Sequence, residues 1–183
     1  MNVFDFDKTI YDGDSTLDFY FYCLKKQPNI AICMPKQIMA AVKYKIGKID
    51  KTGFKEEFYS FFCKLDNIEN MVIDFWNINE NKIKKWYVEI QNMNDIVISA
   101  SPYFLLEEIC KRIKIHNLIA SEVNMKTGKY TGSNCYGEEK VRRFQEQYNL
   151  KIDNFFSDSR SDQPMADIAE NKYIVKGDII TPW

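Results

Sequence analysis

Short apolar runs recur along the chain, and each ends in polar or small residues. These runs predict β-strands at residues 2–6, 95–100, 154–159 and 172–176. Apolar residues spaced three or four apart predict helices at residues 102–114 and 137–148, and a turn-rich stretch predicts a hairpin and loop at residues 125–137. Strands that alternate with helices at this spacing indicate an α/β fold, in which helices cover both faces of a parallel sheet.

Residues 15–92 show a different pattern, rich in helix formers and aromatic residues and without a clear buried strand. We expect a helical cap here, inserted after the first strand, so that residues 1–14 and 93–183 form the sheet core. Aromatic residues such as Phe54 and Phe58 follow helical spacing. They form either the interior of the insertion or the wall of a pocket that faces the sheet.

Composition narrows the class of partner. The chain has 183 residues with 25 basic and 26 acidic side chains, a balance that predicts no surface for nucleic acid or anionic membranes. A small-molecule substrate is therefore expected, and the oligomeric state stays open. No apolar run reaches the length of a membrane span and no signal peptide is seen, which favours a cytoplasmic protein. The five cysteines are scattered, as expected of reduced core thiols.

Two acidic residues, Asp5 and Asp7, lie one residue apart at the end of the first predicted strand. Carboxylates held so close together repel each other unless a cation or a proton intervenes. Oxygen ligands without histidine or cysteine suit Mg²⁺, which proteins bind through one or two carboxylates, water and a substrate phosphate. Asp158 and Asp162, which follow a later strand, could complete such a site. The alternative for each acidic pair is an ordinary solvated turn.

Further along the chain, candidate phosphate ligands also lie at the end of a predicted strand or near the start of a predicted helix. Ser99 ends a predicted strand, and a helix opens at Pro102, so a hydroxyl and free backbone N–H groups face one edge of the sheet. Lys140, near the start of a later helix, could supply a cation. Taken singly, these residues are as well explained by a helix start and a solvated lysine. Their order along the chain is what indicates a phosphate site.

This order resembles the haloacid dehalogenase superfamily, in the branch that includes phosphoserine phosphatases. The four segments that carry the resemblance are "DFDKTI" with Asp5, Asp7 and Thr9, "ISAS" with Ser99 and Ala100, "GEEK" with Lys140, and "SDSRSD" with Asp158 and Asp162. The resemblance implies a Rossmann-like three-layer core with an α-helical cap after the first strand. It also implies a Mg²⁺-dependent phosphatase that hydrolyses a small-molecule phosphomonoester through an aspartyl-phosphate.

The resemblance also implies roles for individual residues. Asp5 would be the nucleophile and Asp7 the general acid and base. Thr9, Ser99, Ala100 and Lys140 would bind phosphate together with Asp5. Asp5, Asp7 through its backbone carbonyl, and Asp158 would hold Mg²⁺, with Asp162 holding a metal-bound water or Lys140. Phosphotransfer or mutase chemistry at the same site remains an alternative, as does a non-catalytic phosphate-binding protein.

The predicted substrate pocket departs from the resemblance. Asp14 stands where phosphoserine phosphatases commonly carry a glutamate; it either caps the first helix or faces the substrate. Residues 15–92 contain no arginine to clamp a carboxylate and offer lysines such as Lys51 and Lys55 instead. We therefore expect phosphoserine to be a poor substrate, and a neutral or cationic, apolar leaving group to be preferred. The single histidine, His116, is expected to be structural.

Overall fold

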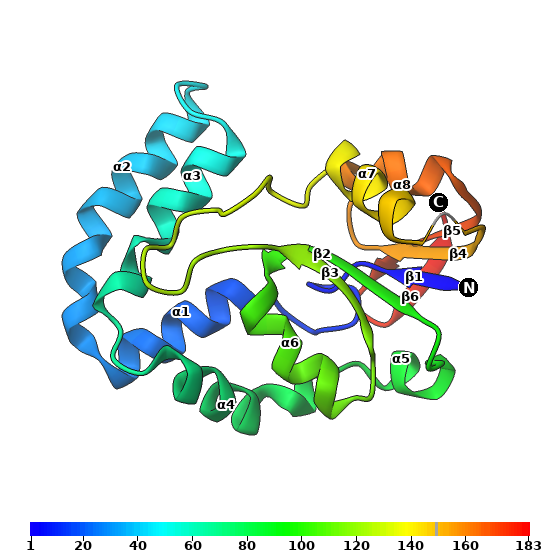
Figure 1. Ribbon diagram of the computed structural model, residues 1–183, viewed down its shortest axis with the longest axis horizontal. Helices are drawn as coiled ribbons and strands as arrows, with labels where there is room; N and C mark the ends of the chain where they lie inside the picture. The colour runs from blue at the N-terminus through cyan, green and yellow to red at the C-terminus, as the bar shows by residue number, and fades with distance from the viewer. Residues whose placement is uncertain (149) are drawn as a thin grey trace.

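A computed structural model describes residues 1–148 and 150–183. Its sheet has the strand order β3-β2-β1-β4-β5-β6, in which the first five strands run parallel and β6 is antiparallel to β5 (Figure 1). The strands are β1 (Asn2–Phe4), β2 (Ile96–Pro102), β3 (Asn117–Ser121), β4 (Ile152–Ser157), β5 (Ala169–Lys176) and β6 (Ile179–Pro182). The predicted α/β fold with a parallel sheet is confirmed.

The helices fall into two groups along the chain. Those between β1 and β2 are α1 (Ser15–Lys26), η1 (Pro28–Cys33), α2 (Met34–Lys45), α3 (Lys51–Phe58), η2 (Tyr59–Lys64), α4 (Ile68–Asn79), η3 (Glu80–Lys82) and α5 (Lys85–Ile90). Those that follow β2 are α6 (Tyr103–Arg112), α7 (Glu138–Gln147), η4 (Arg160–Asp162) and α8 (Gln163–Asp167). Residues 15–92, all of which the structure describes, thus form only helices and connections; their assignment as a separate cap domain stays a prediction. None of the described helices is long and apolar enough to cross a membrane.

Two strands, β3 and β6, were not predicted from the hydrophobic pattern. β3 has only five residues, and polar Asn117 and Ser121 bound its short apolar centre; β6 is a largely exposed edge strand, so neither forms a long buried apolar run. The predicted hairpin at 125–137 is present in part, since Val123 and Tyr130 pair antiparallel across a turn. At Gly128 in that turn, φ is +69° and a Cβ would lie 2.3 Å from the Tyr59 carbonyl oxygen, so the turn packs on η2 only because this residue is glycine.

The sheet buries an apolar surface on each face because successive side chains of a strand point to opposite sides. Val3, Ile98 and Phe155 belong to the cluster that also contains Phe144 of α7. Their strand neighbours join a second cluster, which extends without interruption into the aromatic residues of the helical insertion. Members of that cluster include Phe4, Val97 and Phe156 from the sheet and Phe19, Phe61, Phe62, Phe75 and Trp76 from the insertion. The insertion is thereby fixed to the sheet through shared apolar packing.

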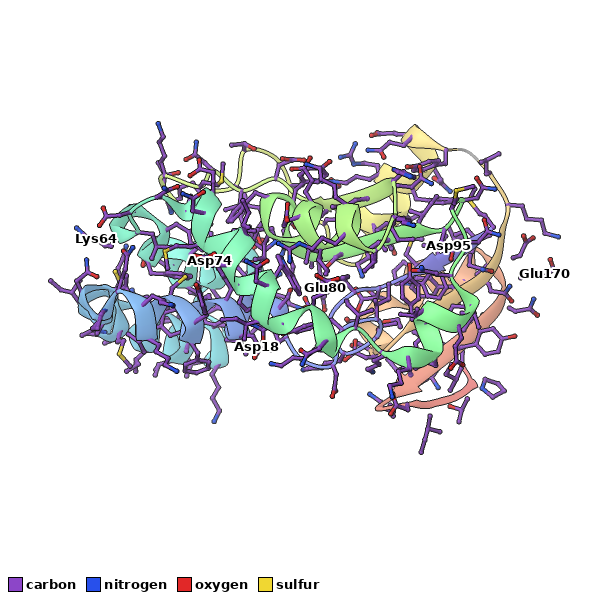
Figure 2. All side chains as sticks on the ribbon, turned by 90° about the horizontal axis from the view of Figure 1, so that it is seen from below. Asp18, Lys64, Asp74, Glu80, Asp95 and Glu170 are labelled. Carbon is purple, nitrogen blue, oxygen red and sulfur yellow. The ribbon has the colours of Figure 1, made fainter. Side chains whose placement is uncertain are left out.

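Lys84 closes the junction between the insertion and the sheet. Its side chain is buried, and its Nζ donates hydrogen bonds to the carbonyl oxygens of Lys8 at 2.6 Å and Gly177 at 2.7 Å. Burial lowers the pKa of this lysine. Nearby, Asp18 of α1, labelled in Figure 2, accepts hydrogen bonds from Tyr11 at 2.7 Å and Lys82 at 3.0 Å. Lys8 adopts a left-handed conformation with φ of 59°, which Lys84 helps to hold.

Replacing Lys84 with methionine should lower the free energy of unfolding by about 2 to 4 kcal/mol, because two inward-facing carbonyls lose their donor. Equilibrium urea unfolding measures this change. Lys85→Met, at the exposed neighbouring position, is the matched control and should leave stability nearly unchanged. Equal midpoints for the two variants would contradict the bridging role of Lys84.

Candidate active site

A cavity of about 400 Å³ opens where the carboxyl ends of the central strands meet α1 and α3. Polar loops at the carboxyl ends of parallel strands are where open α/β sheets bind ligands. Of the nine site residues predicted from the sequence, eight line this cavity: Asp5, Asp7, Asp14, Ser99, Ala100, Lys140, Asp158 and Asp162. Segments far apart in the sequence therefore converge on one site, whereas His116 lies outside it on the surface.

Lys140 lies at the base of the cavity and is almost wholly buried. Its Nζ donates to Asp5 Oδ1 at 2.8 Å and to Asp162 Oδ2 at 2.9 Å. The Ser157 hydroxyl donates to the same Asp162 oxygen at 2.8 Å. Burial alone would lower the pKa of Lys140, but the two carboxylates outweigh it and hold the pKa above its usual value. The lysine therefore brings a permanent positive charge to the site.

Asp5 follows β1 directly, and its backbone N–H still donates to the Phe156 carbonyl of β4 at 2.9 Å. Burial raises the pKa of Asp5 to about 7; Lys140 opposes this rise and Asp162 adds to it. Thr9, predicted to bind phosphate, is fully buried and is not among the cavity-lining residues. Its hydroxyl lies 3.4 Å from Asp5 Oδ2 as a hydrogen-bond donor. The geometry thus favours Thr9 as a partner of Asp5.

Asp7 is held by two donors from different elements. The Ser15 backbone N–H donates to Oδ1 at 2.7 Å, and the Ser101 hydroxyl donates to Oδ2 at 2.5 Å. Burial raises the pKa of Asp7 to about 6, and Asp14 adds to the rise, whereas both donors oppose it. The hydroxyl of Thr16 lies 3.0 Å from that of Ser101 and completes the network.

Sequence reasoning missed Ser101, although a signal was present. Ser99 and Ser101 are two residues apart in β2, and residues at this spacing share a face of a strand. Both line the cavity, and the Ser101 backbone N–H donates to the Ser99 hydroxyl at 3.1 Å. The pairing of β2 with β3 shifts register between Ile98 and Pro102, so both serines lie at an irregular strand end, where such shifts often position side chains for function.

Asp14 caps helix α1 and also borders the cavity, so its two predicted positions do not exclude each other. Its carboxylate accepts a hydrogen bond from the Leu17 backbone N–H at 3.0 Å, which confirms it as the N-cap of α1. The same side chain lines the cavity. A contact between Asp14 and a substrate amine or hydroxyl stays a proposal.

Helix α3 and the loop before α7 supply the opposite wall. Lys55 Nζ donates to the Ala100 carbonyl oxygen at 2.7 Å, and burial, with Lys51 beside it, lowers the pKa of Lys55 to about 8. Lys51 Nζ lies 3.5 Å from the centre of the Tyr136 ring. The two interpretations of the aromatic residues both hold, each for different residues: Phe54 and Phe58 line the cavity, while Phe61 and Phe62 are packed in the core.

The acidic residues form an oxygen-only donor set, which fits a hard cation such as Mg²⁺. Within the part of the chain that the structure describes, no three acidic, histidine or cysteine side chains are grouped to hold a metal. That arrangement is compatible with Mg²⁺, which commonly takes one or two carboxylates and completes its shell with water and phosphate. Asp5 and Asp158 are the carboxylates that would serve, with the Asp7 carbonyl. Asp162 is already bonded to Lys140, which favours an indirect role for it.

Comparison with known proteins places this fold. A protein of unknown function from Bordetella pertussis Tohama I has a TM-score of 0.75 at 17% identity, over 94% of this chain and 87% of that one. A phosphoserine phosphohydrolase-like protein from Francisella tularensis subsp. tularensis SCHU S4 has a TM-score of 0.60 at 14% identity, over 94% and 86%. A phospho-aspartyl intermediate analogue of phosphoserine phosphatase has a TM-score of 0.51 at 16% identity, over 93% and 83%. These likenesses show a shared Rossmann-like fold.

Comparison of the sequence with protein-family models identifies the family, whereas the structural likenesses show only the fold. Among curated protein sequences none matches this chain. A family model described as haloacid dehalogenase-like hydrolase matches residues 3–167, a span that includes every site residue named above. The resemblance drawn from the four segments is confirmed, and the chain belongs to the haloacid dehalogenase-like hydrolase family.

Proposed function

We propose that the protein is a Mg²⁺-dependent phosphatase that hydrolyses a small-molecule phosphomonoester through an aspartyl-phosphate at Asp5. The observation that carries the proposal is the placement of buried Lys140 between Asp5 and Asp162 at the floor of a cavity lined by Asp7 and Ser99. A charged lysine beside a carboxylate nucleophile is what an approaching phosphate dianion requires. The structural likeness to proteins described as phosphoserine phosphohydrolase-like supports the same chemistry.

In the first step, an Asp5 oxygen attacks phosphorus, the ester P–O bond breaks, and Asp7 gives its proton to the leaving oxygen. In the second step, water attacks the phosphorus of the aspartyl-phosphate, Asp7 takes the proton of that water, and Asp5 is released with inorganic phosphate. Lys140 and Ser99 hold the phosphate oxygens through both steps. Mg²⁺ held by Asp5, Asp158 and the Asp7 carbonyl would neutralise the negative charge of the phosphate.

Burial suits Asp7 to this double role. A pKa raised to about 6 keeps a fraction of Asp7 protonated near neutral pH, so it can give up a proton and later regain one. The hydrogen bonds from Ser101 and Ser15 fix the carboxylate in position for both transfers.

Asp5→Asn should abolish phosphate release while leaving the fold intact, because the amide is nearly isosteric but cannot attack phosphorus. The assay is a panel of phosphate esters with Mg²⁺, read as free phosphate, with thermal unfolding as the control for folding.

The same panel, applied to the unaltered protein, tests the alternative functions. Isomerised product without free phosphate would identify a mutase instead. Binding of phosphate esters without turnover by the unaltered protein would identify a binding protein.

Ser101→Ala should lower kcat by roughly 10-fold or more with a smaller change in KM, because Asp7 loses the hydroxyl that orients it. It should also move the acidic limb of the kcat profile to higher pH, since the Ser101 hydrogen bond lowers the pKa of Asp7. Ser133→Ala, at an exposed position outside the lining residues, serves as the matched control. An unchanged pH profile in Ser101→Ala would contradict this role.

The wall opposite the acidic residues supports a substrate proposal. No arginine lines the cavity among the described residues; Lys55 is committed to the Ala100 carbonyl, and Lys51 lies over Tyr136. A planar fork that could clamp a carboxylate is thus missing from this wall. The two lysines also disfavour a cationic leaving group. Of the neutral and cationic leaving groups expected from the sequence, the neutral ones therefore remain. We expect an ester with an uncharged, partly apolar leaving group to exceed phosphoserine in kcat/KM.

The lowered pKa of Lys55 predicts a pH dependence. Because this ammonium loses its proton near pH 8 and not near its usual value, kcat/KM for a phosphate ester should fall as the pH rises through about 8. In Lys55→Met that limb should be absent, and kcat/KM at neutral pH should be roughly 10-fold lower, because the charged hydrogen bond that fixes the Ala100 carbonyl beside the proposed phosphate site is lost. Lys64→Met, at the exposed lysine labelled in Figure 2, should keep the limb. A limb that survives in Lys55→Met would assign it to another group.

A further inference from the structure

Helix α2 carries its apolar side chains on the side that faces away from the protein. Met34, Ile38, Val42 and Ile46 follow one another at intervals of four residues, and their exposed fractions are 39%, 61%, 50% and 58%. Residues four apart lie above one another on the same face of a helix. A surface helix of a globular protein normally directs such a stripe toward the core, so the orientation of α2 is the reverse of the usual one.

The inward side of α2 shows that the fold does not use this stripe. Gln37 and Ala40 are the buried residues of the helix. Gln37 accepts a hydrogen bond from the Tyr20 hydroxyl at 3.0 Å and donates one to the Phe58 carbonyl oxygen at 2.8 Å. Polar contacts therefore fix α2 in place, and its apolar stripe contributes little to folding. Together with its exposed neighbours in sequence the stripe forms what we call the α2 surface: Ile32, Met34, Ile38, Met39, Val42 and Ile46.

Charge is segregated around this surface. Residues 19–49 contain no aspartate or glutamate but six lysines, all exposed: Lys25, Lys26, Lys36, Lys43, Lys45 and Lys48. At about 100° per residue, Lys36 and Lys43 lie beyond the Ile46 side of the stripe, and Lys45 falls within it, between Met34 and Ile38. The near-neutral charge of the whole chain conceals this segment, so the expectation of no membrane contact did not take it into account.

We infer that the α2 surface docks on an anionic lipid bilayer as an interfacial helix. Exposed apolar residues flanked by lysines are the pattern of helices that lie in the plane of a membrane, where the apolar side enters the acyl boundary and the lysines meet anionic headgroups. A second copy of the chain fits less well, because a two-fold contact would bring together two lysine clusters in which, among the described residues, only Lys36 is ion-paired, with Glu57 at 2.7 Å.

Docking in this way would place the cavity close to the bilayer. Tyr44 of α2 stacks on Phe54 of α3, with ring centroids 5.4 Å apart, and Phe54 lines the cavity. Figure 1 shows α2 and α3 side by side at the end of the molecule away from β4, β5 and β6. The helical insertion thus presents the cavity wall on α3 and the α2 surface on its outer side.

The experiment is co-sedimentation of the intact protein with phosphatidylcholine vesicles that contain or lack phosphatidylglycerol. The protein should sediment with the anionic vesicles alone, and added salt should release it. Lys43→Gln with Lys45→Gln should weaken partitioning roughly 25-fold, about five-fold for each lysine. Ile38→Ser with Val42→Ser should weaken it at least about 10-fold, since two inserted side chains are lost.

The matched control is Ile78→Ser with Val88→Ser, which removes two side chains of similar exposure, 61% and 51%, from α4 and α5. It should bind vesicles as the unaltered protein does, and thermal unfolding should be alike for all variants. Absence of binding to anionic vesicles, or an equal loss in the control, would overturn the inference. So would a dimer in sedimentation equilibrium that Ile38→Ser with Val42→Ser dissociates, because the second copy would then be the occupant.

Discussion

The hydrogen bonds of Lys140 to two carboxylates are the constraint on which the site depends. Asp5, Asp7, Asp158 and Asp162 all line one cavity, and burial raises the pKa of the first three. Such a group would be unstable without a buried cation, because each carboxylate loses hydration and repels the others. Lys140 of α7 supplies that cation through hydrogen bonds to Asp5 after β1 and to Asp162 of η4. In the proposed mechanism, its charge keeps Asp5 available as a nucleophile and gives an incoming phosphate a partner.

The rest of the fold serves to bring these groups together. Parallel pairing of β1 with β2 and β4 aligns the three strand ends. Residues far apart in the sequence, such as Asp5 and Asp162, therefore lie close together in the fold, and both bind Lys140. Apolar packing on both faces of the sheet fixes the strands, and the aromatic residues of the insertion continue one of these cores. Lys84 then holds the loop after Asp7 by its backbone, which ties the chemistry to the end of the insertion.

The sequence allowed the strand ends that carry polar groups to be predicted, together with the α/β fold that aligns them. Asp5, Asp7, Ser99 and Lys140 were named from their order along the chain and from the resemblance, and the structure brings all four to one cavity. The contacts between individual side chains could not be predicted from the sequence. Ser101 matters through its contact with Asp7, and Thr9 through Asp5, and neither contact can be read from spacing alone. β6 was missed because an exposed edge strand needs no apolar run, only a partner strand to pair with.

The helical insertion raises the same issue at the level of a whole surface. Net charge averages over the chain, whereas a bilayer or a substrate meets only the side chains on one face. Residues 19–49 hold lysines without acids, while the acids that balance them lie elsewhere in the sequence, five of them in the lining of the cavity. Since α2 packs on α3, one helical pair carries both an outward apolar surface and an inward wall of Phe54, Lys55 and Phe58. The hydrogen bond from Gln37 to the Phe58 carbonyl oxygen joins the two sides of this pair, because Phe58 also lines the cavity.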